Sequence, residues 1–74
     1  MEQPMKWYAA HTVTASHGTW KMAAVAIQDG EVIGLRQIIG EPPNTMWLGG
    51  TILLKRADNG KMTAYHVDSD KWLK

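Results

Sequence analysis

The sequence contains no cysteine and no phenylalanine, and it carries almost no net charge. Without cysteine, the fold has no disulfide and no thiolate metal site to support it. A formal net charge of +1 argues against a dedicated nucleic-acid-binding protein, which usually has a clear basic excess. The same charge leaves little repulsion between copies, so self-association near neutral pH is not opposed.

Long hydrophobic runs are also missing. Every apolar run falls far short of the ~20 residues that a membrane helix needs. The opening Met-Glu-Gln-Pro lacks the basic and apolar stretches of a signal peptide, which predicts a cytoplasmic protein without membrane contact. The 74 residues predict a single domain, 1–74, with flexible ends at 1–5 and 68–74. A domain of this size buries only about 60% of its unfolded surface, so a partner or a second copy is expected to add stability.

Two dipeptides predict hairpin turns. Asp29-Gly30 and Asn59-Gly60 lie between runs rich in β-formers, and both suit tight turns that need positive φ angles. The predicted strands are residues 6–14, 19–28, 31–39, 51–56 and 61–67. The sequence therefore predicts an all-β fold, a five-stranded antiparallel meander curled into a small sandwich or an open barrel.

Alternation along these strands predicts their faces. On strand 6–14, one face is expected to carry Trp7, Ala9, His11 and Val13, and the other Tyr8, Ala10 and Thr12. A strict two-residue turn at Asp29-Gly30 would pair Ala26 with Ile33. A bulge at Gly34 is the preferred alternative, because it gathers four apolar residues on one side: Val25, Ile27, Val32 and Leu35.

The second hairpin and the long connection complete the prediction. A two-residue turn at Asn59-Gly60 pairs Leu54 with Tyr65 and Ile52 with Val67, and predicts these four as one buried face. In the connection 40–50, Pro42-Pro43 holds the chain extended. Trp47 and Leu48 are expected to fold back onto the sheet, and Gly49-Gly50 to allow a sharp bend into the next strand.

The middle of the chain also has a family pattern. Segment 25–35 reads Val-Ala-Ile-Gln-Asp-Gly-Glu-Val-Ile-Gly-Leu, and segment 41–50 reads Glu-Pro-Pro-Asn-Thr-Met-Trp-Leu-Gly-Gly. With the Ala-His-Thr-Val of 10–13, these segments resemble the N-terminal β-sandwich domain of amidohydrolase-superfamily enzymes, over about residues 7–54. In those enzymes the next strand leads into a His-x-His metal motif. Here strand 51–56 leads to Asn59-Gly60 instead, so the resemblance implies a stand-alone β-module without a metal site or a catalytic barrel.

The third alternative for the function is a remnant of a metal-dependent enzyme, but its catalytic and metal-binding candidates are few. His66, Asp68 and Asp70 alternate and would point the same way on an extended segment, but structural zinc normally takes four protein ligands. The hydroxyls of Thr12, Ser16 and Ser69 have no recognised nucleophile context. We therefore expect no catalytic residue, no bound metal and no cofactor, and a protein that is not an enzyme.

The remaining surface signals are tryptophans and scattered basic residues. A small barrel for single-stranded nucleic acid would use stacking and basic side chains, and the candidates are Lys21, Arg36, Lys55, Arg56 and Trp20. The six Asp and Glu residues interspersed with them disfavour this alternative, and Trp20 is expected to cap the core. The favoured function is a non-catalytic binding or protein-interaction module, a homo-oligomer and most simply a dimer. Its interface candidates are Trp47, Leu48, Trp72, Leu73 and Trp7.

Overall fold

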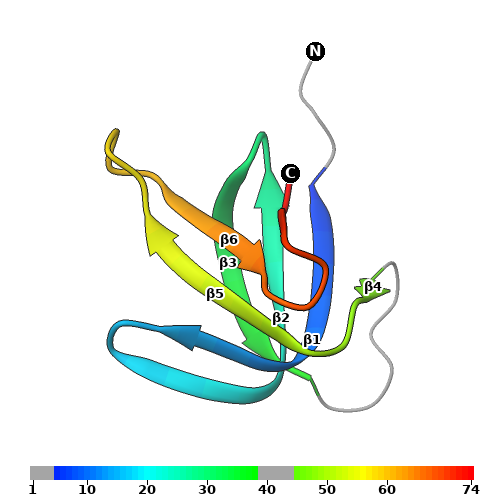
Figure 1. Ribbon diagram of the computed structural model, residues 1–74. Coiled ribbons are helices and arrows are strands. Elements are labelled where there is room, and N and C mark those ends of the chain that lie inside the picture. The colour runs from blue at the N-terminus through cyan, green and yellow to red at the C-terminus, as the bar shows by residue number, and fades with distance from the viewer. Residues whose placement is uncertain (1–4, 39–44) are drawn as a thin grey trace.

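Seven strands form one mixed sheet in the computed structural model, which describes residues 5–38 and 45–74. The strands are β1 (Lys6–Ala15), β2 (Gly18–Gln28), β3 (Glu31–Gln37), β4 (Thr45–Trp47), β5 (Thr51–Arg56), β6 (Met62–His66) and β7 (Lys71–Trp72). No residue in the two described ranges is helical, and none forms a helix that could cross a membrane. The all-β prediction is confirmed (Figure 1). The Pro42-Pro43 stretch lies outside the described residues.

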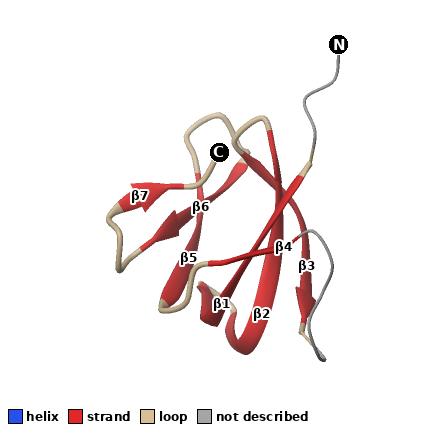
Figure 2. Cartoon of the chain, turned by 90° about the vertical axis from the view of Figure 1, so that its right-hand side faces the viewer, coloured by secondary structure: helices blue, strands red, loops and turns tan. Residues whose placement is uncertain are grey.

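The strand order corrects the predicted five-stranded meander. The order is β3-β2-β1-β5-β6-β7, and β4 pairs with β1 beside β5. β1 is antiparallel to β2 but parallel to both β4 and β5, which follow each other along one edge of β1 (Figure 2). The connection after β3 therefore carries the chain across to the far side of β1. The sheet curls until β3 contacts β6, although no ladder joins these two strands.

The first Asp-Gly hairpin has the predicted turn and the predicted bulge. Asp29 and Gly30 have φ angles of 55° and 79°, as a two-residue turn with two left-handed residues requires. The register shifts by one residue where Gly34 faces Ala26, so the bulged alternative is confirmed. The four residues expected on one side all belong to the core or pack against it: Val25, Ile27, Val32 and Leu35.

The Asn-Gly hairpin has the predicted Gly60 geometry but a different register. Gly60 has a φ of 87°, and its N–H donates to the Ala57 carbonyl at 2.9 Å. The Ala57 N–H in turn donates to the Lys61 carbonyl at 2.7 Å, so three residues close the loop instead of two. One extra loop residue moves every β6 side chain to the other face of the sheet.

The predicted buried face is therefore right on β5 and wrong on β6. Ile52 is fully buried and faces His66, and Leu54 packs against the core and faces Ala64. Tyr65 faces Leu53 instead, and Val67 is exposed. The residues that β6 buries are Ala64 and His66.

The face prediction for β1 also fails halfway along the strand. The core takes Ala10 and then Val13, which strict alternation would place on opposite faces. The ladder between β1 and β2 omits the pair of His11 and Met22, and Met22 has a φ of 52°. This irregular residue lets both strands change the side that they turn to the core.

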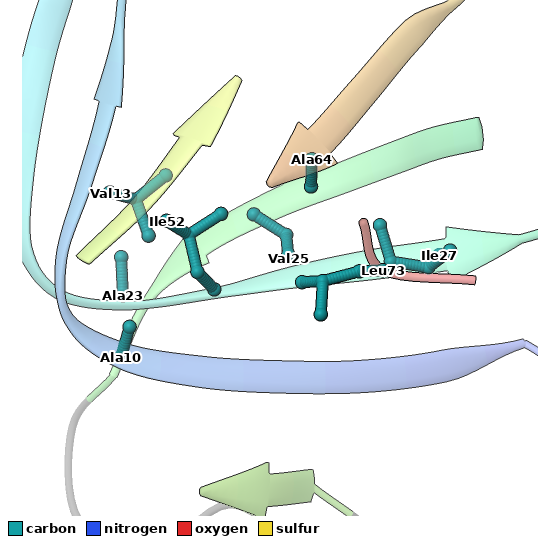
Figure 3. Close-up of a cluster of buried hydrophobic side chains, with 8 residues drawn as sticks. All are labelled: Ala10, Val13, Ala23, Val25, Ile27, Ile52, Ala64 and Leu73. Atoms are coloured by element: carbon teal, nitrogen blue, oxygen red, sulfur yellow. The ribbon is translucent and has the colours of Figure 1, made fainter. Parts of the chain in front are cut away.

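The core is thin. Its cluster lies between β1, β2, β5, β6 and the chain end (Figure 3), and consists of Ala10, Val13, Ala23, Val25, Ile27, Ile52, Ala64 and Leu73. Six of the eleven buried hydrophobic residues of the described chain are alanines. Trp20 packs against the cluster, as expected of a core-capping residue. Several larger apolar side chains remain outside this core, and two of them, Trp47 and Trp72, line the candidate site.

Candidate interaction surface

Trp47 and Trp72 line the same groove, although 25 positions separate them in the sequence. The groove is shallow and open and has a volume of about 510 Å³. We call it the tryptophan groove. Its lining residues are Tyr8, Trp47, Leu48, His66, Ser69, Lys71, Trp72, Leu73 and Lys74.

Short β4 positions Trp47 on one wall of the groove. β4 pairs with the first half of β1, with Trp47 opposite Ala9, and the Leu48 N–H donates to the Ala9 carbonyl at 2.8 Å. The Trp47 ring meets His11 edge to face, with the ring centres 4.8 Å apart, yet half of the residue stays exposed. Folding back of Trp47 and Leu48 onto the sheet is thus confirmed, and Trp47 offers its free half to the groove.

The opposite wall comes from the chain end. Trp72 lies opposite Tyr65 in the β6–β7 pair, with ring centres 5.0 Å apart, and it is 52% exposed. The Leu73 N–H donates to the Ala64 carbonyl at 2.9 Å, and the Tyr8 hydroxyl donates to the Lys74 carbonyl at 3.1 Å. The segment expected to be a flexible tail therefore forms part of the fold.

Leu73 has a different place from the one predicted. The residue is 9% exposed and belongs to the core cluster. Trp72 and Leu73 are neighbours on an extended segment, so their side chains point to opposite sides. One of the two can face solvent only if the other faces the core, and the structure gives the exposed place to Trp72.

The floor of the groove contains His66, which is 4% exposed. Its Nδ1 lies 2.6 Å from the Ser69 hydroxyl, and its Nε2 lies 2.9 Å from the Gly49 carbonyl oxygen. The Asp68 carboxylate is 3.8 Å from Nε2 and accepts the Thr51 N–H at 2.9 Å. A serine–histidine contact alone does not make a catalytic centre, because acyl transfer also needs donors around the developing oxyanion.

The expected alignment of His66, Asp68 and Asp70 on an extended segment is wrong. Residues 67–70 form a turn, and Asp70 has a φ of 55°. Within residues 5–38 and 45–74, no group of three His, Asp or Glu side chains could hold a metal ion.

Trp7 occupies a separate but adjoining surface. Its ring lies over Gly34, where an added Cβ would be 3.6 Å from it, and the Arg36 guanidinium sits 4.3 Å from the ring centre. A second groove of about 380 Å³ runs beside it, lined by Met5, Lys6, Trp7, Tyr8, Thr45 and Met46. Tyr8 lines both grooves, so the two surfaces are continuous.

The nucleic-acid candidates do not line the tryptophan groove. Arg36 is stacked on Trp7, and the Arg56 Nη1 donates to the Gly60 carbonyl at 3.0 Å. Lys21 and Lys55 are exposed on β2 and β5, and Trp20 packs on the core with His17 beside it. These five residues thus come from different parts of the sheet. The groove, in contrast, joins four of the five interface candidates, namely Trp47, Leu48, Trp72 and the buried Leu73.

No known protein family, curated protein or solved structure matches the chain. The resemblance to the amidohydrolase β-module accordingly stays a prediction from the residues quoted above. Sequence reasoning missed Tyr8 and His66 as groove residues. His66 lies two residues after Ala64 and therefore on the same face of β6, which could have identified it as buried. The two-residue turn assumed at Asn59-Gly60 placed both residues on the outer face instead.

Proposed function

We propose that the protein is a non-catalytic interaction module that forms a two-fold dimer through the tryptophan groove. One observation carries this proposal: the described chain exposes more large apolar side chains than it buries. Seven are exposed, namely Met5, Met22, Ile33, Met46, Trp47, Val67 and Trp72. Five buried hydrophobic residues are larger than alanine, namely Val13, Val25, Ile27, Ile52 and Leu73. Four of the seven line the two grooves, namely Met5, Met46, Trp47 and Trp72, and a contiguous apolar surface of this kind marks an interaction site.

A second copy of the chain fits this surface in charge. The net charge of +1 opposes association only weakly. Both signs of charge lie at or beside the groove: Lys71 and Lys74 line it, and the exposed Asp68 and Asp70 lie in the turn that leads into Lys71. A two-fold interface joins a patch to itself, so a patch with both signs can pair each charge with its opposite on the other copy.

A dimer interface of standard size would take a modest share of the surface of this chain and would extend beyond the two grooves. A standard interface covers about 800 Å² on each partner, roughly a sixth of the 5120 Å² that this chain exposes. The tryptophan groove and the adjoining groove beside Trp7 together offer one continuous area with four exposed or half-exposed aromatic residues: Trp7, Tyr8, Trp47 and Trp72. Aromatic residues are enriched in the cores of protein interfaces.

Light scattering over a dilution series tests the proposal. At tens of micromolar, the wild-type chain should give twice its 8.3 kDa mass. Trp47→Ala and Trp72→Ala should shift the mass toward the monomer. Ile33→Ala is the matched control, because Ile33 is equally exposed but lies on β3, outside both grooves. A monomer at every concentration contradicts the proposal, as does an Ile33→Ala effect as large as that of the tryptophan variants.

A further inference from the structure

His66 is the one buried polar residue of the described chain, and it lies beneath the tryptophan groove. Burial of a polar ring is costly unless both nitrogens have partners. A small domain could fill this place with an apolar side chain at no such cost, so a buried histidine with two partners calls for a physical explanation.

The partners of the ring determine its tautomer. The Gly49 carbonyl oxygen can only accept, so Nε2 must carry the hydrogen that donates to it at 2.9 Å. In the neutral ring Nδ1 is then an acceptor, and the Ser69 hydroxyl donates to it at 2.6 Å. His66 thus bridges two segments of the chain through one donated and one accepted hydrogen bond.

These two segments are the ones that carry the groove tryptophans. Gly49 lies next to Trp47, and a Cβ added to Gly49 would be 3.7 Å from the Trp47 indole nitrogen. Ser69 belongs to the turn 67–70, which leads directly into Lys71 and Trp72. Both walls of the groove are therefore tied to the same imidazole.

Two neighbouring hydrogen bonds reinforce this link. The Asp68 carboxylate accepts the Thr51 N–H at 2.9 Å, and the Val67 N–H donates to the Thr51 carbonyl at 2.9 Å. Gly50 leaves no space for a side chain, because an added Cβ would overlap the Asp68 carboxylate. The turn after β6 and the loop before β5 are thus held in close contact, with His66 at the buried centre.

We infer that His66 is the positioning residue of the tryptophan groove. It fixes the spacing between Trp47 and Trp72, and through this spacing it sets the affinity of one copy of the chain for another. The inference rests on the proposed dimer, but its effect on the two tryptophans is a property of each single chain.

Three variants separate positioning from simple stability. His66→Leu removes both hydrogen bonds and keeps the bulk, His66→Gln keeps a donor for the Gly49 carbonyl, and Ser69→Ala removes only the bond to Nδ1. Dimer dissociation is measured by sedimentation equilibrium well below the melting temperature. In the same samples, the indole N–H resonances of Trp47 and Trp72 report on the groove at dilutions where only monomer is present.

His66→Leu should weaken dimerisation about tenfold, because the Gly49 carbonyl and the Ser69 hydroxyl lose the partner that they share, and a tenfold change is the upper end of what one such hydrogen bond contributes. His66→Gln should restore most of the affinity, and Ser69→Ala should move the Trp72 indole resonance more than that of Trp47. Wild-type affinity in His66→Leu overturns the inference, and so does a His66→Gln variant as weak as His66→Leu. If His66→Leu does not fold, the ¹⁵N shifts of the wild-type ring decide, because the Nδ1–H tautomer would contradict the bridge.

The outcomes also separate this inference from the dimer proposal. If the wild-type chain is monomeric but its Trp47 and Trp72 resonances both move in His66→Leu, the dimer proposal is wrong and the positioning role of His66 stands. If the chain is dimeric and His66→Leu changes neither the two indole resonances nor the dimer affinity, the dimer proposal stands and the positioning role of His66 is wrong.

Discussion

Leu73→Ala tests whether the chain end belongs to the fold. Leu73 is 9% exposed, and its side chain lies in the core with Ile27, Val25 and Ile52 (Figure 3). The change removes three carbons, which at about 0.8 kcal/mol per buried CH₂ costs about 2.4 kcal/mol before any cavity term. Measured Leu→Ala losses in cores run from about 2 to 5 kcal/mol, and a position at the core margin belongs in the lower half of that range.

The assay is urea unfolding followed by circular dichroism, with the slope m unchanged between variants. In a thermal melt of the same variant, the melting temperature should fall by about 10–20 °C, since each kcal/mol is worth roughly 4–8 °C in a domain of this size. Val67→Ala is the control, because Val67 is 43% exposed and its backbone bond to Thr51 survives the change. All measurements use one protein concentration, since dimerisation makes stability concentration-dependent. A loss below about 1 kcal/mol would refute docking of the chain end.

The remaining predictions concern glycines, salt and the outer face of the sheet. Gly50→Ala should destabilise more than Gly30→Ala in thermal melts, because both residues have positive φ but only the Cβ at Gly50 would overlap Asp68; equal losses would contradict the described loop. Gly30→Ala should cost about 1–2 kcal/mol from the left-handed backbone alone. Dimer affinity should change less than threefold or so between 50 and 500 mM NaCl if apolar contacts dominate, whereas a steep salt dependence together with binding of oligonucleotides would favour the nucleic-acid alternative. Gly34→Val should displace the Trp7 ring from the sheet and break its contact with Arg36, because the added Cβ alone would lie 3.4 Å from Ala26 and 3.6 Å from the Trp7 ring. The displacement would appear as a change in the Trp7 indole resonance.

The sequence predicted the features of the fold that depend on neighbouring residues. Asp29-Gly30 and Asn59-Gly60 identified both hairpins, because their backbone preference acts within the turn itself. Gly34 identified the bulge for the same reason. These signals are local, and the all-β class follows from them.

Pairing between strands that are distant in the chain could not be predicted from the sequence. The parallel pairing of β1 with β5 joins Val13 to Ile52 across a long connection, and no turn residue encodes it. The faces of β6 depended on a single loop residue, since a three-residue loop at 58–60 reverses what a two-residue turn predicts. Small differences in loop length thus decide which side chains a sheet buries.

The candidate site was predictable in its parts and not as a whole. Trp47 and Trp72 were identified because they lie outside the predicted strands and have large apolar surfaces. The sequence could not show that two short strands, β4 and β7, bring them to one groove. It also could not show that Leu73 turns inward while Trp72 turns outward, because that choice depends on the register of β7 against β6.

The four tryptophan side chains offer the most direct test of the proposed interface. Each indole N–H gives its own resonance in a ¹⁵N-labelled sample, so one dilution series reports on all four positions. We expect the Trp47 and Trp72 resonances to move together with concentration, and the resonance of Trp20, which packs on the core, to stay fixed. Four resonances that do not move between a few and several hundred micromolar, or a shift confined to Trp20, would contradict a dimer formed through the tryptophan groove.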